Sequence, residues 1–420
     1  MHVLMLSWEF PPLVVGGIAR HVHDLAVSLA REGAQVTILT AGGAQAKPVE
    51  HLDGITVHRV LPANPTPLDL TGHIMQLNLN LLERGLSLAA QGEVFDLVHA
   101  HDWVTAYAGK ALKHGLDLPL LATIHATEWG RNNGLHNDLQ RYISSIEWWL
   151  CFEAWRVICC SRYMAGELRQ VFQLPEDKLR TIVNGVYPEE FTSGPIPAGF
   201  RERYAAPDEK ILFHVGRLVR EKGLDILLDA LPQILMGYPR VKLIIAGRGG
   251  YEAELKARAE RLGIYHRVYF TGYIDDQTRN LLYRLADAAV FPSLYEPFGI
   301  VALEAMAANV PPVVSDTGGL SEVVVHGRNG LKVQTGNAGS LAENVLWMLN
   351  HPDKVAEMRA AAGQDVRRLY NWRDIAHETR RVYEEVLAEN RQFQQKGRPA
   401  IAPWKLTEME APNRYSRAMG

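Results

Sequence analysis

The stretch Ser293-Leu-Tyr-Glu-Pro-Phe-Gly-Ile-Val-Ala-Leu-Glu304 places two carboxylates, Glu296 and Glu304, eight residues apart. The apolar run 288–293 predicts a buried strand, and residues 299–308 predict a helix. Glu296 is therefore expected in a strand-to-helix turn. In an open α/β sheet, ligands bind outside the carboxyl ends of the strands, where such turns lie. Free N–H groups at the helix start favour an anion, so the pattern predicts a phosphate-bearing ligand.

The same spacing argues against a carboxylate pair that hydrolyses a single glycosidic bond. Eight helical residues span about 12 Å at 1.5 Å each, whereas glycosidase carboxylates lie roughly 5–9.5 Å apart. Two carboxylates that hold the two ends of a long ligand fit the spacing better. From spacing alone, a turn acid followed by a solvated helix acid explains the pattern equally well.

Composition limits the class of protein. A chain of 420 residues exceeds one ordinary core, so two domains are expected. A net charge of −3 argues against a broad nucleic-acid surface. The three cysteines follow no disulfide or metal spacing, which indicates a reducing compartment. The apolar N-terminal run is too short for a signal peptide, and no run of about 18 apolar residues predicts a membrane span. A cytoplasmic location is therefore expected.

Apolar runs alternate with helical patterns along both halves of the chain. The first half predicts strands at 3–6, 36–39, 56–60, 97–100, 120–124, 157–160 and 181–183. The second half predicts strands at 211–215, 241–246, 268–271, 288–291 and 312–315. Continuous apolar strands separated by helices predict parallel sheets that are covered on both faces. The fold class is therefore α/β, with two doubly wound, Rossmann-like domains.

The boundary between the two series lies within residues 188–207, where Ser193-Gly-Pro-Ile-Pro-Ala-Gly199 breaks both periods. We expect a first domain over residues 1–195 and a second over 196–373. Helical patterns at 353–369 and 374–392 follow. Residues 397–420 contain three prolines and are predicted to form a loosely held tail.

Two loops supply candidate phosphate ligands. One loop ends in Gly16-Gly17 and opens a helix, where a backbone without Cβ atoms can approach a ligand closely. The other carries Gly216, Arg217 and Lys222, whose two cations could clamp a diphosphate. Taken alone, each loop is also consistent with an ordinary turn or with solvated charges. The absence of G-x-G-x-x-G and of G-x-x-x-x-G-K-[ST] argues against a dinucleotide dehydrogenase and a P-loop enzyme.

His99 and His101 share one face of a predicted strand, but no third ligand is spaced to complete a metal site. No D-x-D motif is present, and no metal is predicted.

The segment 139–155 is unusually aromatic, and a helix there places Tyr142, Trp149 and Phe152 on one side. A core helix is the favoured interpretation. The alternatives are a platform for a sugar chain or a membrane-surface patch. Because Glu147 and Glu153 accompany the basic residues, the sugar platform is favoured over the membrane.

Together these blocks resemble the retaining glycosyltransferases with the two-domain GT-B fold. The chain is similar to the large family that includes bacterial and archaeal glycogen synthases and sucrose synthase, glycosyltransferase family 4, over about residues 1–390. The most specific element is the E-x7-E motif from Glu296 to Glu304. The next is the block Gly216-Arg-Leu…Glu-Lys222-Gly-Leu-Asp225.

The resemblance implies a donor site for a nucleoside-diphosphate sugar, ADP-glucose or UDP-glucose, with no metal and no other cofactor. Arg217 and Lys222 would bind the diphosphate. Glu296 would face the donor sugar, and Glu304 would hold the ribose. The remaining implied donor contacts are Gly17, Gly216, Tyr273, Ile274, Phe298, Gly299 and Ile300.

On the first domain, His125 matches the family's histidine beside the reacting sugar, and Asp102 matches an acid used by glycogen synthases. Arg131 is either an acceptor contact or a surface charge. The last helix would cross back to the first domain. The family's retaining transfer is usually assigned to front-face attack through an oxocarbenium-like state, which needs no enzyme nucleophile. It needs positioning and a stabilised leaving group.

One departure concerns the acceptor assignment. Glycogen synthases usually carry a lysine two residues before the Gly-Gly, where this chain has Val14. Arg20 is a candidate replacement. The resemblance favours glucosyl transfer to the end of an α-1,4-glucan. The alternatives are a mannosyl- or glucosyltransferase with a lipid-linked or small acceptor, and a non-catalytic sugar-nucleotide-binding protein. A sugar-phosphate epimerase shares the fold, but the E-x7-E motif argues for transfer.

Overall fold

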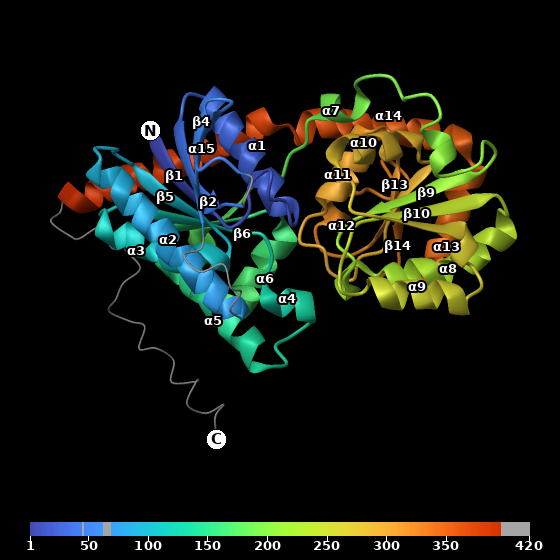
Figure 1. The fold of residues 1–420 in the computed structure, drawn as a ribbon, viewed down its shortest axis with the longest axis horizontal. Helices are drawn as coiled ribbons and strands as arrows, with labels where there is room; N and C mark the ends of the chain where they lie inside the picture. Colours follow the sequence, from blue (N-terminus) through green and yellow to red (C-terminus); the bar gives the residue numbers. More distant parts are fainter. Residues whose placement is uncertain (44–45, 62–68, 396–420) are drawn as a thin grey trace.

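The computed structural model describes residues 1–43, 46–61 and 69–395 and has two α/β domains side by side (Figure 1). The first sheet has the strand order β3-β4-β2-β1-β5-β6-β7-β8, and the second has the order β11-β10-β9-β12-β13-β14. Among the described strands, β3 and β4 are the antiparallel pair and the other pairs are parallel. The predicted α/β class with two doubly wound domains is confirmed. The tail predicted at 397–420 lies outside the described residues.

The strands agree closely with the apolar runs. Those of the first sheet are β1 (His2–Ser7), β2 (Gln35–Ala41), β3 (Val49–Leu52), β4 (Ile55–Val60), β5 (Leu97–His101), β6 (Leu120–Ile124), β7 (Arg156–Cys159) and β8 (Leu179–Thr181). Those of the second are β9 (Lys210–Val215), β10 (Val241–Ala246), β11 (Val268–Gly272), β12 (Ala288–Phe291), β13 (Pro312–Ser315) and β14 (Leu331–Val333). Two edge strands, β3 and β14, were not predicted because each is short and lacks a continuous apolar run. The run at 181–183 overlaps β8 by one residue only.

The helices of the first domain are α1 (Gly17–Arg31), α2 (Leu70–Ala90), α3 (Ala106–Gly115), α4 (Glu128–Asn132), α5 (Asp138–Glu153) and α6 (Arg162–Phe172). The later helices are α7 (Pro188–Thr192), α8 (Leu224–Gly237), α9 (Glu252–Arg261), α10 (Asp276–Leu285), α11 (Ile300–Ala307), α12 (Leu320–Val323), α13 (Ala338–Asn350), α14 (Pro352–Leu369) and α15 (Trp372–Gln395). Several begin at polar caps: Ser161 accepts a hydrogen bond from Met164 N at α6, and Asp275 accepts one from Thr278 N at α10.

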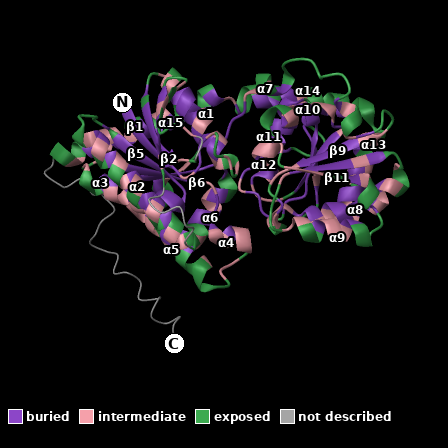
Figure 2. Cartoon of the chain, in the orientation of Figure 1, coloured by how far each residue is buried: buried purple, intermediate pink, exposed green. Residues whose placement is uncertain are grey.

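Buried residues concentrate on the strands and on the inner faces of the helices (Figure 2). The core-helix interpretation of α5 holds, but through Ile143, Ile146 and Leu150 rather than through the aromatic side chains. Tyr142 stays partly exposed with its hydroxyl 2.8 Å from that of Tyr107. The aromatic residues of α5 therefore lie near the domain surface, where Trp149 still packs against the core. Within the described residues, no helix combines the length and apolar character needed to cross a membrane.

The chain passes between the domains twice. The segment after β8 leads into α7, whose Phe191 ring lies 6.0 Å from that of Tyr283 on α10. Residues 188–192, which the sequence analysis placed at the end of the first domain, thus contact the second. The helix α15 returns to the first domain beside α1 (Figure 1). There the Tyr383 hydroxyl lies 2.7 Å from His99 Nδ1, and Arg156 on β7 forms an ion pair with Glu385.

Candidate active site between the two domains

The loops that follow the strands of the two sheets meet between the domains. A Cβ atom on Gly17, at the start of α1, would lie 3.2 Å from Ile300 Cδ1, at the start of α11. The Ser161 hydroxyl donates to the Pro297 carbonyl at 2.6 Å, and the Thr127 N–H donates to the Tyr295 hydroxyl at 3.3 Å. The turn at Gly17 and the turn that precedes α11 therefore face one shared site.

Lys222 and Glu296, which are far apart in sequence, form an ion pair in this site. Lys222 Nζ lies 2.7 Å from Glu296 Oε2, and the Ser293 hydroxyl donates to the same oxygen at 3.2 Å. Lys222 ends a short 3₁₀ helix (Arg220–Lys222), and Gly223 follows it with a φ of +62°. A Cβ at Gly223 would lie 2.1 Å from the Pro292 carbonyl oxygen, so only glycine fits this approach.

Arg217 lies on the same loop, and its side chain has one ion pair among the described residues. Its side chain is 45% exposed, and Nη2 lies 3.3 Å from Glu221 Oε1. Gly216, just before it, takes an ordinary strand-end position: its N–H donates to the Ala246 carbonyl at 3.0 Å. The Arg217 guanidinium is therefore free to turn toward a ligand at low cost.

The start of α11 offers unused hydrogen-bond donors. Gly299 has a φ of +103°, which lets the chain turn sharply into the helix. Among the described residues, the N–H groups of Phe298, Gly299 and Ile300 have no hydrogen-bond acceptor. Backbone donors at a helix start form an anion site. These donors are available for the phosphate contact that the sequence predicts at this turn, and that contact stays a prediction.

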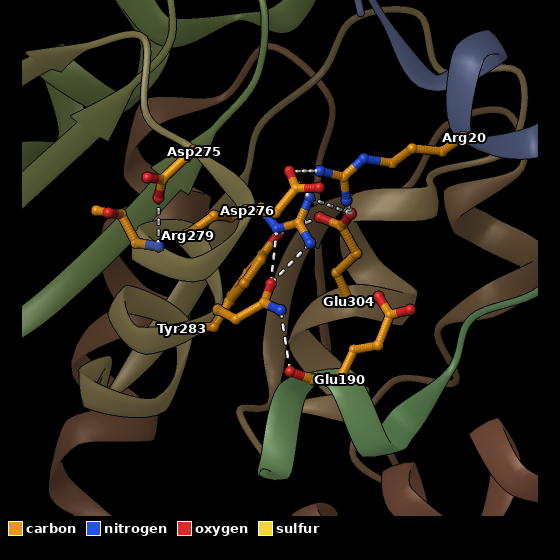
Figure 3. A network of polar contacts seen from close by, with 9 residues as sticks. Arg20, Glu190, Asp275, Asp276, Arg279, Tyr283 and Glu304 are labelled. Carbon is orange, nitrogen blue, oxygen red and sulfur yellow. Dashed lines mark hydrogen bonds and ion pairs between the residues drawn. The ribbon is translucent and has the colours of Figure 1, made fainter. Parts of the chain in front are cut away.

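Glu304, further along α11, is enclosed by a polar network that spans the two domains (Figure 3). Arg20 of α1 lies with Nη1 3.0 Å from Glu304 Oε1, and the Tyr283 hydroxyl donates to Oε2 at 3.0 Å. Arg20 also pairs with Asp276, at the start of α10. Burial raises the pKa of Glu304, and the Arg20 charge acts in the opposite direction. The candidate replacement for the lysine missing at position 14 thus lies at the predicted ribose carboxylate.

The start of α1 differs from expectation. The buried Glu9 carboxylate accepts hydrogen bonds from the N–H groups of Val15 at 2.5 Å and Gly16 at 2.9 Å. Burial raises the pKa of Glu9, and these N–H groups partly offset the rise. An internal carboxylate therefore binds two N–H groups just before α1, and the N–H of Gly17, the residue predicted to approach the diphosphate, is not one of them. Glu9, in Trp8-Glu-Phe-Pro-Pro12, was visible in the sequence, but its contact with the start of α1 was not predicted.

His125 and Asp102 form a second unit, at the ends of β6 and β5, in which Asp102 is buried and His125 is partly exposed. Asp102 Oδ1 accepts a hydrogen bond from the His125 backbone N–H at 2.7 Å. Burial raises the pKa of Asp102 to about 6, while Arg131 opposes the rise. Burial also lowers the pKa of His125 to about 3, so its ring is neutral near pH 7.

The His125 ring belongs to a cluster with His101 and His21. His125 Nε2 lies 3.1 Å from His101 Nδ1, and one ring nitrogen from each of the three lies within 4.8 Å of the others. His21 Nδ1 lies 2.8 Å from Asn184 Oδ1. These three rings are a candidate metal-ligating set. The sequence analysis considered His99 with His101, but the His99 ring bonds Tyr383 and Thr123 instead.

Tyr273 and Ile274, the remaining predicted donor contacts, lie at the edge of the site. Tyr273 follows β11 and is 61% exposed, and its neighbour Ile274 is partly buried. Among the described residues, Tyr273 makes no hydrogen bond to any other predicted site residue. The structure thus brings most of the predicted residues to one place and leaves this pair at its edge.

Several residues at the site were not identified from the sequence. The Tyr295 hydroxyl of the second domain donates to Glu167 Oε1 of the first at 2.9 Å. A Cβ at Gly130 would lie 2.5 Å from the Tyr295 ring, so glycine is required there. Tyr295 immediately precedes Glu296, which was the only signal for it. These contacts form only when the two domains meet.

Two Rossmann-like domains with a shared site between them are the architecture of the GT-B glycosyltransferases. Residues 15–190 match the family model described as Glycosyltransferase Family 4, and residues 199–366 match Glycosyl transferases group 1.

The relatives agree with these matches. The chain is 38% identical over 387 residues to an uncharacterized glycosyltransferase of Methanocaldococcus jannaschii, covering 91% of this chain and 98% of that protein. It is 35% identical over 400 residues to a glycogen synthase of Mycobacterium tuberculosis, covering 91% and 94%. Its fold matches that of sucrose-phosphate synthase from Thermosynechococcus elongatus with a TM-score of 0.81 and 26% identity, covering 93% and 100%. The chain belongs to the family 4 glycosyltransferases.

Proposed function

We propose that this glycosyltransferase moves glucose, with retention, from a nucleoside-diphosphate glucose to the end of an α-1,4-glucan. The observation that carries the proposal is the Lys222–Glu296 pair, 2.7 Å apart, beside the open N–H groups at the start of α11. A cation beside a helix start suits a leaving diphosphate. The relationship to the mycobacterial glycogen synthase supports glucose and glucan as the substrates.

In this proposal, positioning and charge stabilisation supply most of the rate. Arg217 and Lys222 neutralise the leaving diphosphate, and Glu304 holds the ribose. Nε2 of the neutral His125 ring lies 3.1 Å from His101 Nδ1, so the Nδ1 of His125 is the nitrogen that can orient a sugar hydroxyl. An ionised Asp102 beneath it favours the positive charge of an oxocarbenium-like state. No enzyme nucleophile takes part.

We expect transfer to proceed without a metal ion and the protein to be cytoplasmic. Arg217 and Lys222 supply the positive charge that a divalent cation provides in other transferases. The three cysteines are buried and unpaired, in keeping with a reducing compartment. Unchanged turnover in EDTA would support metal independence, and loss of turnover that added Mg²⁺ restores would contradict it.

A mannosyl- or glucosyltransferase with a lipid-linked or small acceptor is the second candidate. The observation that favours it is Val14, where glucan synthases of the family carry lysine. Transfer to an extracted lipid fraction or to a small polyol, with no effect of glucan, would select this alternative.

The deciding experiment offers the purified protein ADP-glucose, UDP-glucose or GDP-mannose, each with and without maltooligosaccharide, and measures nucleotide release. We expect glucan-dependent release from one glucose donor, with lengthening of the chain by one hexose. Donor hydrolysis that is indifferent to glucan would contradict the acceptor. No release from any donor would contradict catalysis altogether.

A further inference from the structure

Three histidine side chains of the first domain lie together: His21 early in α1, His101 at the end of β5 and His125 just after β6. The strands β5 and β6 are parallel neighbours in the sheet, so His101 and His125 come to the same edge. The start of α1 packs beside them and adds His21. All three residues belong to one domain, so the cluster does not depend on how the two domains meet.

The hydrogen bond of His21 leaves its other ring nitrogen available as a ligand. Asn184 Oδ1 lies 2.8 Å from His21 Nδ1. Because an amide oxygen only accepts hydrogen bonds, Nδ1 carries the ring proton and Nε2 keeps its lone pair. The residue is buried, and among the described residues this Nε2 has no hydrogen-bond partner. Metal-binding histidines typically donate their second N–H to an oxygen in the same way.

His101 also has an unpaired ring nitrogen. Its side chain is fully buried, and its Nδ1 lies 3.1 Å from His125 Nε2. Within the part of the chain that the structure describes, His101 Nε2 has no hydrogen-bond partner. Buried polar groups of folded proteins normally have a partner, so two unpaired ring nitrogens in one cluster point to a ligand.

The spacing of the rings suits one small cation. Zinc bonds nitrogen at about 2.0–2.1 Å, so two ligands at tetrahedral angles lie roughly 3.4 Å apart. The His101–His125 pair is close to this value at 3.1 Å, and one nitrogen from each of the three rings lies within 4.8 Å of the others. A shift of the rings by roughly 1 Å would bring three nitrogens to the spacing that zinc requires.

The chemistry of the three side chains selects the kind of ion. Mg²⁺ and Ca²⁺ prefer oxygen ligands, whereas imidazole suits Zn²⁺ and its neighbours among the transition metals. Three protein ligands leave the fourth position of a tetrahedral zinc ion to water. His125 is the partly exposed member of the cluster, so this position opens on its side.

A Zn²⁺ ion bound there would oppose the proposed transfer. It would fix the ring of His125, which in the proposed function orients a sugar hydroxyl. It would also add positive charge beside a centre that becomes positively charged in the oxocarbenium-like state. Two positive charges close together raise the barrier to the reaction.

We propose that His21, His101 and His125 bind a Zn²⁺ ion and that this ion inhibits the enzyme reversibly. The binding follows from the three rings alone, whereas the inhibition rests on the proposed function. The ion takes no part in the reaction, in line with the metal-independent transfer proposed above.

Calorimetric titration of the chelator-treated protein with ZnCl₂ tests the binding. We expect one Zn²⁺ per chain in the wild type and an affinity that His21→Gln lowers by at least about tenfold. The matched control is His23→Gln, on the same helix, where the histidine ring contacts Asp24. It should bind zinc as the wild type does. No binding by the wild type, or equal affinity in all three proteins, would overturn the site.

Co²⁺ provides a test on the wild type that does not depend on the folding of a variant. Tetrahedral Co²⁺ absorbs visible light strongly and six-coordinate Co²⁺ weakly, so the spectrum reports the geometry of the site. We expect the strong bands, and we expect added Zn²⁺ to remove them. The weak spectrum alone would overturn a site of three histidines. Circular dichroism checks that His21→Gln remains folded.

Nucleotide release in the presence of Zn²⁺ tests the inhibition. We expect Zn²⁺ to slow the wild type and His23→Gln, and EDTA to restore both rates. The inhibition constant of His21→Gln, measured against its own uninhibited rate, should be at least about tenfold higher. Zinc that binds without slowing an active enzyme would overturn the inhibition. No transfer under any condition would overturn the proposed function and the inhibition with it, while the zinc titration still decides the site.

Discussion

Glu296 and Glu304 belong to one short motif but meet different partners. Glu296, in the turn before α11, pairs with Lys222 of its own domain. Glu304, inside α11, pairs with Arg20 from the other domain (Figure 3). Gly299, with a φ of +103°, turns the chain before α11 begins at Ile300, so the two carboxylates face different neighbours. One motif thus places its two carboxylates beside different cations.

At this scale, the first prediction concerns Lys222. Lys222→Ala removes the cation next to Glu296, and we expect kcat to fall by about 10²–10³-fold, the usual cost of losing one stabilising group at a developing charge. The measurement is donor-dependent nucleotide release at saturating substrate. Lys354→Ala, an exposed lysine on α14 paired only with Glu357 among the described residues, is the matched control. Near-normal turnover of a folded Lys222→Ala protein would refute the assigned role.

The second prediction concerns the pH dependence set by Asp102. Because burial raises its pKa from 3.8 to about 6, the folded protein keeps this proton where the unfolded chain has lost it. Stability contributed by Asp102 is therefore present below about pH 4 and declines as pH rises to about 6. Activity should rise over the same interval if the ionised form is needed. His125 acts on stability in the opposite direction, because its pKa is lowered from 6.5 to about 3 and the unfolded chain binds a proton in this interval that the folded protein does not.

Asp102→Asn tests this directly, because the amide oxygen can still accept the hydrogen bond from the His125 N–H. We expect the variant to lose the acidic limb of kcat against pH, and we expect its Tm to rise relative to that of the wild type between pH 4 and pH 7. The groups around Asp102 that also carry charge, Arg131 and Glu9, remain in place. An unchanged acidic limb would assign it to another group.

At the scale of elements, α15 completes the first domain. Its Trp372, Ile375, Tyr383 and Val386 join the core cluster of β1, β2 and α1. The helix also forms polar contacts, from Glu385 and Glu389 to Arg156. The Tyr383 hydroxyl lies 2.7 Å from His99 Nδ1, so α15 packs against β5, the strand that also carries His101.

Tyr383→Phe tests that contact. The change leaves the buried His99 Nδ1 without its partner, and we expect a loss of about 1–3 kcal/mol in the stability of the first domain. Chemical denaturation followed by tryptophan fluorescence measures it. Tyr187→Phe is the control, because its hydroxyl contacts Ser28 at a partly exposed position where water can replace it. Equal losses in the two variants would show that burial of His99 has no special cost.

At the scale of the molecule, the two domains are held in contact on both sides of the site. Arg20 reaches Glu304 and Asp276 on one side. On the other, Glu322 of α12 accepts hydrogen bonds from the N–H groups of Arg162 and Tyr163 at the start of α6. Such contacts between domains are typically modest, so the arrangement can open for substrate exchange.

Arg20→Ala should favour the open arrangement. Breaking a buried ion pair costs about 3–5 kcal/mol, and a partly exposed one less. The Arg20 side chain is 25% exposed, so we expect about 1–3 kcal/mol, a larger radius of gyration in small-angle scattering and a roughly tenfold higher donor KM. Arg31→Ala, on the same helix, is the control. An unchanged radius and donor KM would show that Arg20 does not hold the domains together.

The sequence predicts features that depend on neighbouring residues, and it fails for features that depend on residues far apart in the chain. Continuous apolar strands, glycine turns and the E-x7-E motif are local patterns, and they predicted both sheets and the turn that carries Glu296. The short edge strand β3 was not predicted, because its pairing with β4 defines it and its own composition does not. Glu9 was missed because its partners, Val15 and Gly16, become visible only once the loop is folded.

The sequence by itself determined the fold class, the family resemblance and most of the candidate donor residues, because backbone preference and burial period act over a few residues. Only the tertiary structure joined Arg20 to Glu304, Tyr295 to Glu167 and His21 to the His101–His125 pair. It also formed a cavity between α4 and α9. These features depend on how two domains pack, and packing couples residues that no local pattern connects.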